Sequence, residues 1–280
     1  MKICDLHTHT NFSDGSDSVT DLVTKAAENG IGALALTDHN TVEGLPSFLE
    51  ETRRVGIEGV AGVELSCDYE SGEVHILALF LDESSYPRIE QLCADMASSK
   101  IESNRALISA LKEQGYRIES FDEIYERSVH GNVNRAHIAE SLIRAGYVSS
   151  IKEAFSGILS VERGYYVPPR RIDAMDAISH ISEIGAVSVI AHPYLNLTHA
   201  QLERFLPQAK EAGLVGMETY YPEYDLGIHN LARQTAKKFA LLESGGSDYH
   251  GERKKDRLLS SPCGFYTPYE LYERLREKKR

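Results

Sequence analysis

The sequence predicts an α/β protein whose strands form a barrel or a barrel-like sheet. Three observations support this prediction. Short apolar runs recur along the chain, helical stretches separate most of them, and six or seven such runs fit into 280 residues. With 42% hydrophobic residues, the chain can bury a sizeable core, either as one large domain or as a domain with an insertion.

The predicted elements follow one another in a regular order. A first short strand runs into His7 and His9, and a helical stretch over 19–30 ends at Gly30. Because helices lie between most of the strands, we expect the sheet to be mostly parallel. The further predicted strands cover residues 31–39, 59–66, 73–80, 185–193, 213–221 and 240–251.

One part of the chain has a different pattern. Residues 91–165 show helical periodicity and contain no apolar run typical of a strand. We therefore expect a barrel formed by residues 1–90 and 166–280, interrupted by a helical insertion at 91–165 that contributes to substrate binding.

Charge and composition restrict the classes of partner. The net charge of −12 disfavours a long nucleic-acid duplex, although a small phosphorylated ligand needs only a local positive site. The four cysteines form no CxxC, which disfavours disulfides and Cys-zinc sites. No apolar run approaches the roughly 20 residues of a membrane helix, and the N-terminus lacks the apolar core of a signal peptide. We expect a cytoplasmic protein with no membrane partner.

Histidines and carboxylates gather where the predicted strands end. Each has an ordinary alternative explanation: Asp14 suits a turn, and Asp248 suits a helix N-cap. Because the carboxyl ends of parallel strands meet on one face, however, these residues are expected to converge there. Metal coordination satisfies buried imidazoles and carboxylates that would otherwise be costly. The predicted metal ligands are His7, His9, Asp14, His39, Glu64, His75, His192, Asp248 and His250.

The motifs resemble those of the polymerase-and-histidinol-phosphatase (PHP) family of metal-dependent phosphoesterases. HTHTNFSDG, TDHN, GVELS, AHP and GGSDYHG, with the isolated His75, occur in the family's order between residues 5 and 250. The resemblance implies a distorted (βα)7 barrel of the PHP type that binds two or three divalent metal ions. An imidazole and carboxylate set without thiolate suits Mn, Fe or Zn.

The resemblance also implies a division of the ligands among three metals. The first would take His7, His9, Glu64 and Asp248, the second the bridging Glu64 with His75 and His192, and the third Asp14, His39 and His250. Some family members have a histidine where this chain has Asp14. Asp38 is expected to support His39. The implied reaction is attack on phosphorus by a metal-bound water, without a side-chain nucleophile, so Ser247 is interpreted as a turn residue.

A second motif lies in the insertion. In VNRAHIAESLIRAG, Asn134 can cap a helix whose first turn carries Arg135 and His137, and a helix start suits a phosphate. The alternative is a solvated arginine and an ordinary helix histidine. The motif resembles the Asn-Arg-Pro-His of one PHP branch, with Ala136 in place of the proline, and this implies substrate binding by Asn134, Arg135 and His137. The nearby Tyr165 and Tyr166 could stack on a base or pack in a core.

That branch removes the 3′-phosphate of nucleoside 3′,5′-bisphosphates, which is the activity we expect. The implied partner is a small phosphorylated substrate, namely a nucleotide or a short oligonucleotide. The alternatives are a 5′–3′ exonuclease on short RNA, a phosphatase of another small phosphomonoester such as histidinol phosphate, and a metal-binding module without catalysis.

Overall fold

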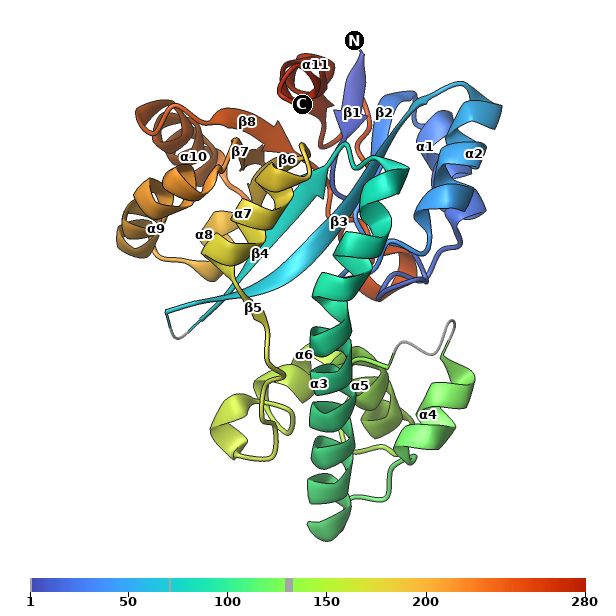
Figure 1. The fold of residues 1–280 in the computed structure, drawn as a ribbon. Coiled ribbons are helices and arrows are strands. Elements are labelled where there is room, and N and C mark those ends of the chain that lie inside the picture. Colours follow the sequence, from blue (N-terminus) through green and yellow to red (C-terminus); the bar gives the residue numbers. More distant parts are fainter. Residues whose placement is uncertain (1, 71, 129–132) are drawn as a thin grey trace. The chain divides into compact units, whose positions relative to one another are not determined.

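The computed structural model describes residues 2–70, 72–128 and 133–280. By its internal contacts the chain forms two compact units (Figure 1). Unit 1 comprises Met1–Glu90 and Arg171–Arg280, and unit 2 comprises Gln91–Arg170. The return to unit 1 at Arg171 comes slightly later than the expected position 166, because the stretch before Arg171 packs with unit 2.

Unit 1 contains one mixed sheet. The strands lie in the order β8-β7-β6-β4-β3-β2-β1-β9, and β5 pairs with β3. Their bounds are β1 Ile3–Asp5, β2 Ile31–Leu36, β3 Glu58–Tyr69, β4 Gly72–Leu79, β5 Ile172–Asp173, β6 Val187–Ala191, β7 Gly216–Tyr220, β8 Leu242–Gly245 and β9 Thr267–Pro268.

The sheet is less parallel than the sequence indicated. β4 runs antiparallel to both of its neighbours, β3 and β6, and β9 runs antiparallel to β1. The reason is local, since β3 and β4 form a hairpin with no helix between them. This reversal explains why His75 lies near the start of its strand, whereas His192 follows the end of β6.

The two ends of the sheet approach each other, so that the sheet is a nearly closed barrel. The Leu6 N–H donates to the Gly245 carbonyl at 3.2 Å, the Asp248 N–H donates to the His7 carbonyl at 2.9 Å, and Thr8 forms a bridge with Tyr249. These contacts join the segment that follows β1 to the end of β8 and to the residues after it. This agrees with the expected distorted barrel and brings the first and last predicted motifs side by side.

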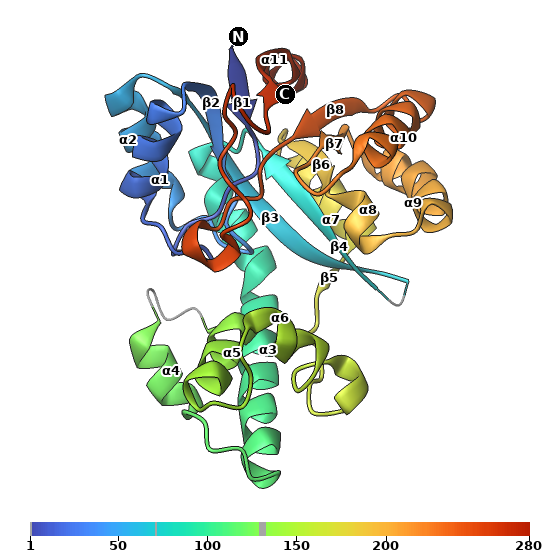
Figure 2. The same cartoon turned by 180° about the vertical axis from the view of Figure 1, so that it is seen from behind.

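Helices cover the outside of the sheet (Figures 1 and 2). α1 and α2 contact β2 and β3, α7 contacts β4 and β6, and α10 and α11 contact the end that contains β8. Apolar side chains of the strands, among them Leu77, Val187 and Val189, form a buried core. The helix bounds are α1 Val19–Glu28, α2 Leu45–Val55, α7 Ala174–Glu183, α8 Pro193–Asn196, α9 His199–Ala212, α10 Leu226–Lys238 and α11 Tyr269–Arg276.

Unit 2 is helical in the part that the structure describes. It contains most of α3 (Tyr86–Glu113), with α4 (Phe121–Arg127), α5 (Arg135–Arg144) and α6 (Ile151–Ser156). Its core is separate and includes Leu107, Ile138 and Leu142. Tyr166 is buried in this core and Tyr165 packs against it, which favours the packing alternative for both.

Two other expectations can be compared with the structure. All four cysteines are free, and Cys4, Cys67 and Cys93 are buried. Among the residues described, no helix combines the length and the apolar character needed to cross a bilayer.

Candidate metal centre

The segment after β1 brings two imidazole rings together, tilted by 52° to each other. The Nε2 atoms of His7 and His9 lie 3.1 Å apart. The backbone here is fixed from both sides, because the His9 N–H donates to the Tyr249 carbonyl and the Thr8 carbonyl accepts from the Thr37 N–H. At most one proton can lie between two such nitrogens, so at least one lone pair points into the space between them.

Glu64 lies at the middle of the cluster and is fully buried. Its Oε1 lies 2.8 Å from His75 Nδ1 and 3.0 Å from His192 Nε2. Its Oε2 lies 3.1 to 3.2 Å from nitrogens of His7, His9 and His39. Each carboxylate oxygen therefore faces a different group of imidazoles. Burial alone would raise the pKa of Glu64, but the surrounding histidines hold that pKa well below its usual value.

The other two carboxylates lie at the edge of the same cluster. Asp248 Oδ1 is 3.2 Å from His9 Nε2 and 3.3 Å from His250 Nδ1. Asp14 Oδ1 is 3.2 Å from His250 Nε2 and 3.8 Å from His39 Nε2. Three groups of side chains thus come close enough to hold a metal: His9, Asp14, His39 and His250; His7, His9, Glu64 and Asp248; and His39, Glu64 and His75. His192 joins them through its contact with Glu64.

Several polar atoms of this cluster are buried without a hydrogen bond. Within the described ranges, His9 Nδ1, His39 Nδ1, Glu64 Oε2 and His250 Nε2 have no hydrogen-bond partner. Leaving such atoms unpaired costs about 1–3 kcal/mol each. Divalent cations bound by the three groups would satisfy them, and imidazole with carboxylate is a ligand set that Mn, Fe and Zn accept. The residues therefore fit a metal centre, and none of the three groups includes a cysteine.

A further carboxylate, Glu218, holds two of the histidines in place. Its Oε1 lies 3.0 Å from His7 Nδ1, and its Oε2 accepts the His192 N–H at 2.6 Å. His192 has a φ of 27° and Asp248 a φ of 50°, both in the left-handed region that non-glycine residues rarely adopt. Strain of this kind persists where the surrounding contacts fix the backbone. We did not predict a role for Glu218, whose only sequence signal is its position at the end of a strand.

Asp38 has a different role from the one expected. Its carboxylate accepts hydrogen bonds from the Thr10 N–H and hydroxyl and from the Ser13 hydroxyl, whereas His39 faces Glu64 and Asp14. Asp38 therefore supports the loop between His9 and Asp14. Ser247 is fully buried and its N–H donates to Asp5, which is consistent with a structural residue.

The pKa values of the histidines are shifted in opposite directions, depending on whether neighbouring carboxylates or burial dominates. Burial opposes the charge of His7 and His75, but Glu64 and the neighbouring Glu218 or Glu73 outweigh it, raising the pKa of His7 to about 10 and that of His75 to about 9. Burial dominates at His250 and lowers its pKa to about 3. Metal ions bind neutral imidazole, so they compete with protons chiefly at His7 and His75.

A hollow of about 130 Å³ opens onto the cluster. Besides metal-ligand candidates it is lined by Leu195, Asn196, Tyr221, Lys254 and Arg257. We did not predict any of these five. Asn196 lies 2.8 Å from His192 Nδ1, and Tyr221 donates to Asp248 at 2.8 Å. The two cations lie in a run of charges, GERKKDR, whose pattern is typical of a solvated surface.

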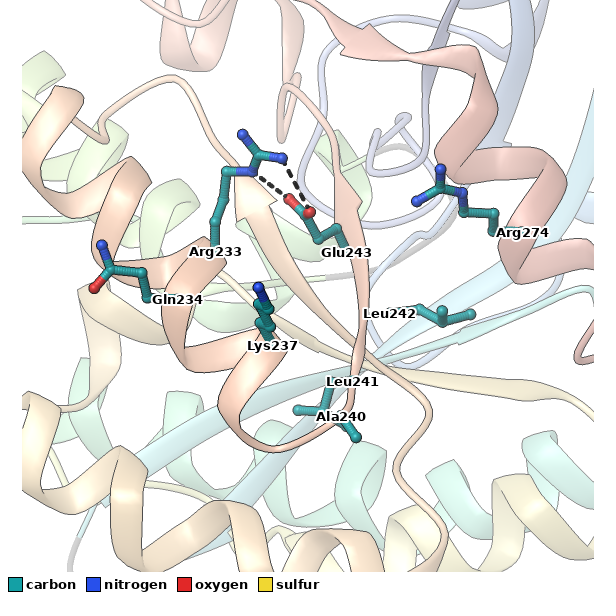
Figure 3. A pocket seen from close by; sticks show the side chains of 8 residues that line it. All are labelled: Arg233, Gln234, Lys237, Ala240, Leu241, Leu242, Glu243 and Arg274. Atoms are coloured by element: carbon teal, nitrogen blue, oxygen red, sulfur yellow. Dashed lines mark hydrogen bonds and ion pairs between the residues drawn. The ribbon is translucent and has the colours of Figure 1, made fainter.

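A larger hollow of about 560 Å³ lies near the amino end of β8 (Figure 3). It is lined in part by Arg233, Glu243 and Arg274, and Arg233 Nε donates to Glu243 at 2.8 Å. None of its lining residues is a histidine or a predicted ligand. The larger opening is therefore separate from the metal centre.

The start of α5 in unit 2 is a well-formed cap. The Asn134 Oδ1 accepts the N–H groups of Ala136 and His137, and His137 Nδ1 accepts the Asn134 N–H. The expected free amides are therefore partly used by the cap. The Arg135 guanidinium lies 4.1 Å above the ring of Tyr166 and 5.0 Å above that of Phe155. Arg135 forms no ion pair with a residue of the described ranges. Its positive charge at the start of α5 is therefore not neutralised by a carboxylate among these residues.

The geometry can be compared with known proteins. The model of the PHP domain family matches residues 5–167. The chain is 31% identical over 259 residues to the phosphoribosyl 1,2-cyclic phosphate 1,2-diphosphodiesterase of Eggerthella lenta, covering 89% of this chain and 94% of the relative. It is 31% identical to the 5′-3′ exoribonuclease Rnm of Escherichia coli, covering 97% and 94%.

Two further comparisons agree with this family. The chain is 29% identical to the 3′,5′-nucleoside bisphosphate phosphatase of Chromobacterium violaceum, covering 91% of this chain and 90% of the relative. The crystal structure of a Bifidobacterium adolescentis protein assigned as a metal-dependent phosphoesterase superposes with a TM-score of 0.87 at 25% identity, covering 100% and 97%. Together with the histidine and carboxylate cluster around Glu64, these matches show that the chain belongs to the PHP domain family.

Proposed function

We propose that the chain is a metal-dependent phosphatase that removes the 3′-phosphate of nucleoside 3′,5′-bisphosphates. The observation that carries the proposal is the position of Glu64, whose two oxygens face five imidazoles in a cluster with unpaired buried atoms. Such a carboxylate can bridge two cations. We assign two or three divalent ions to the nine ligands predicted from the sequence.

Divalent ions, when bound, neutralise phosphate charge and make water a stronger nucleophile near neutral pH. In this proposal the protein fixes the ligands and supplies no nucleophile of its own; Ser247, which is fully buried, is interpreted as a structural residue. In the hydrolysis, a water oxygen bonds to phosphorus and the bond from phosphorus to the sugar 3′-oxygen breaks. The leaving oxygen takes a proton, and the products are a nucleoside 5′-monophosphate and inorganic phosphate.

A bisphosphate carries a second phosphate that does not react, and we assign its binding to the start of α5. Arg135 supports this assignment, because its guanidinium is held over Tyr166 and has no ion pair among the described residues. At the other end of the same helix, Arg144 is paired with Glu119. Asn134 and His137 would act mainly by fixing the helix start, since they bond to each other's backbone.

A second candidate is hydrolysis of a cyclic phosphodiester on a phosphorylated ribose. The specific observation is the 31% identity, over 89% of this chain, to the phosphoribosyl cyclic phosphate diphosphodiesterase. Both candidate substrates carry two phosphates on one ribose, so the same remote site would serve either. They differ in whether the reacting phosphate is a monoester or a diester.

A substrate panel separates the candidates. Protein loaded with Mn²⁺ would be assayed with adenosine 3′,5′-bisphosphate, phosphoribosyl 1,2-cyclic phosphate, a 5′-phosphorylated RNA dinucleotide, AMP and histidinol phosphate. We expect the highest kcat/KM with the bisphosphate and poor turnover of AMP and histidinol phosphate. A higher kcat/KM with the cyclic phosphate or the dinucleotide would replace our assignment by that activity, and no turnover by metal-loaded protein would refute a phosphoesterase.

A further inference from the structure

The segment that follows the last two metal-ligand candidates returns to the same hollow. After Asp248 and His250, a short 3-10 helix (Gly251–Lys254) turns the chain so that Lys254 and Arg257 line the opening of the metal centre. The side chain of Arg257 is only 12% exposed, and that of Lys254 is 36% exposed. Their neighbour Lys255 is 76% exposed and pairs with Glu252. Lys254 and Arg257 are thus turned toward the hollow, whereas Lys255 is not.

Arg257 has a defined position through its partners. It contacts the Oδ2 of Asp248 and, with its other terminal nitrogen, Glu223. The Tyr221 hydroxyl donates to the same Asp248 oxygen at 2.8 Å. Asp248 therefore uses Oδ2 for these donors and turns Oδ1 toward His9 and His250. This makes Arg257 a positioning residue that aims one carboxylate oxygen at the metal centre.

Lys254 is left with a weak partner. Its ammonium lies 3.5 Å from Asp248 Oδ2, an oxygen that already has two closer donors. The structure gives Lys254 no other ion pair within the described ranges. Its ammonium group is therefore available to an anion in the hollow, where it lines the opening together with Glu64 and His192.

We propose that Lys254 binds the phosphate group that reacts at the metal centre, while Arg257 holds Asp248 in place. The charge balance supports this. The three ligand carboxylates carry too little charge to neutralise two or three divalent ions. A metal-loaded centre with an ammonium group beside it is therefore positively charged and attracts an anion. A phosphate oxygen accepts a charge-assisted hydrogen bond from an ammonium group. The inference deepens the proposed function and rests on it only for the presence of a phosphate ester at this site.

The test compares Lys254→Met with the matched control Lys255→Met. Binding of inorganic phosphate to Mn²⁺-loaded protein would be measured by calorimetry, with the metal-free protein as baseline for any phosphate site outside the metal centre. We expect Lys254→Met to bind phosphate about tenfold more weakly or worse, as for loss of a charge-assisted hydrogen bond, with metal content unchanged. Lys255→Met should match the wild type, and Lys254→Arg should recover part of the affinity.

Wild-type phosphate affinity in fully loaded Lys254→Met would overturn the inference, as would loss of metal from this variant, because Lys254 would then serve the cluster and not the anion. These readouts do not depend on which ester is hydrolysed. If the wild type shows Lys254-dependent phosphate binding but turns over no ester of the substrate panel, the proposed function fails while the phosphate site stands.

Discussion

The metal centre of unit 1 and the helix start of unit 2 are built in different ways. The metal centre draws side chains from the segments after β1, β2, β6 and β8 and from β3 and β4, and most of them are buried. The helix start depends on one short stretch of chain, in which Asn134 caps the N–H groups of Ala136 and His137, and Arg135 supplies the cation. In a site assembled from many strands, substitution of one side chain disturbs the neighbours that it contacts. In a single helix turn, one side chain can be substituted with little effect on the others. This difference accords with our proposal that unit 1 supplies the chemistry and unit 2 the choice of substrate.

The largest effect should come from Glu64→Gln. The change removes the charge that five imidazoles face while keeping the shape of the side chain. Metal content should fall and kcat/KM should drop for every substrate, by more than the roughly 10- to 100-fold that loss of a residue behind a ligand costs. Elemental analysis and steady-state rates check this, with Glu243→Gln, a half-buried glutamate outside the metal centre, as control. Full metal content in Glu64→Gln would contradict a bridging role.

Arg135→Met should have the next largest effect, and only on substrate binding. Loss of a charge-assisted contact to the remote phosphate should cost about 2–3 kcal/mol in kcat/KM for the bisphosphate. The gap between the bisphosphate and a nucleoside 3′-monophosphate should narrow, and metal content should not change. Arg144→Met, at the other end of α5, is the matched control. Equal kinetics for the two variants would show that Arg135 is an ordinary surface residue.

Glu218→Gln sharpens the comparison inside unit 1. The amide can still contact His7 and the His192 N–H, but it no longer stabilises a positive centre beside them. We expect metal affinity to fall by about 10-fold, toward the low end of effects for residues behind a ligand. Competition with a metal-sensitive dye measures the affinity. If Glu218→Gln bound metal as weakly as Glu64→Gln, Glu218 would itself be a ligand.

The smallest effect concerns protons. The pKa of His7 is raised to about 10 and that of His75 to about 9, so both imidazoles are protonated and positively charged near pH 7 in metal-free protein. Metal binding must release these protons, about two per centre, and the apparent metal affinity should rise with pH until both histidines are neutral, at about pH 9 to 10. For the metal-free protein, the same raised values contribute stability that is fully present below about pH 6.5 and is lost as pH rises through 9 to 10. Calorimetry in two buffers of different ionisation enthalpy measures proton release, and its absence would contradict the assignment.

The sequence predicted much of the barrel and the set of residues around Glu64, because histidines and carboxylates at strand ends leave a strong pattern. The antiparallel direction of β4 was missed because the alternation of strands and helices was applied to the whole chain; the gap between the predicted strands 59–66 and 73–80 is too short for the crossover that a parallel pair needs. Lys254 and Arg257 were missed because GERKKDR is indistinguishable from a solvated run until the chain turns at Gly251. The role of Asp38 was misassigned because its partners, Thr10 and Ser13, lie in a distant loop.

The central claim is that the metal centre hydrolyses the 3′-phosphate of a bisphosphate while the other phosphate is held elsewhere. The most direct measurement is phosphorus NMR of adenosine 3′,5′-bisphosphate turned over by Mn²⁺-loaded protein, with chelator-treated protein as control. The account predicts AMP and inorganic phosphate as products, formed only by the loaded protein. Adenosine 3′-monophosphate as the main product, or equal turnover after chelation, would contradict it.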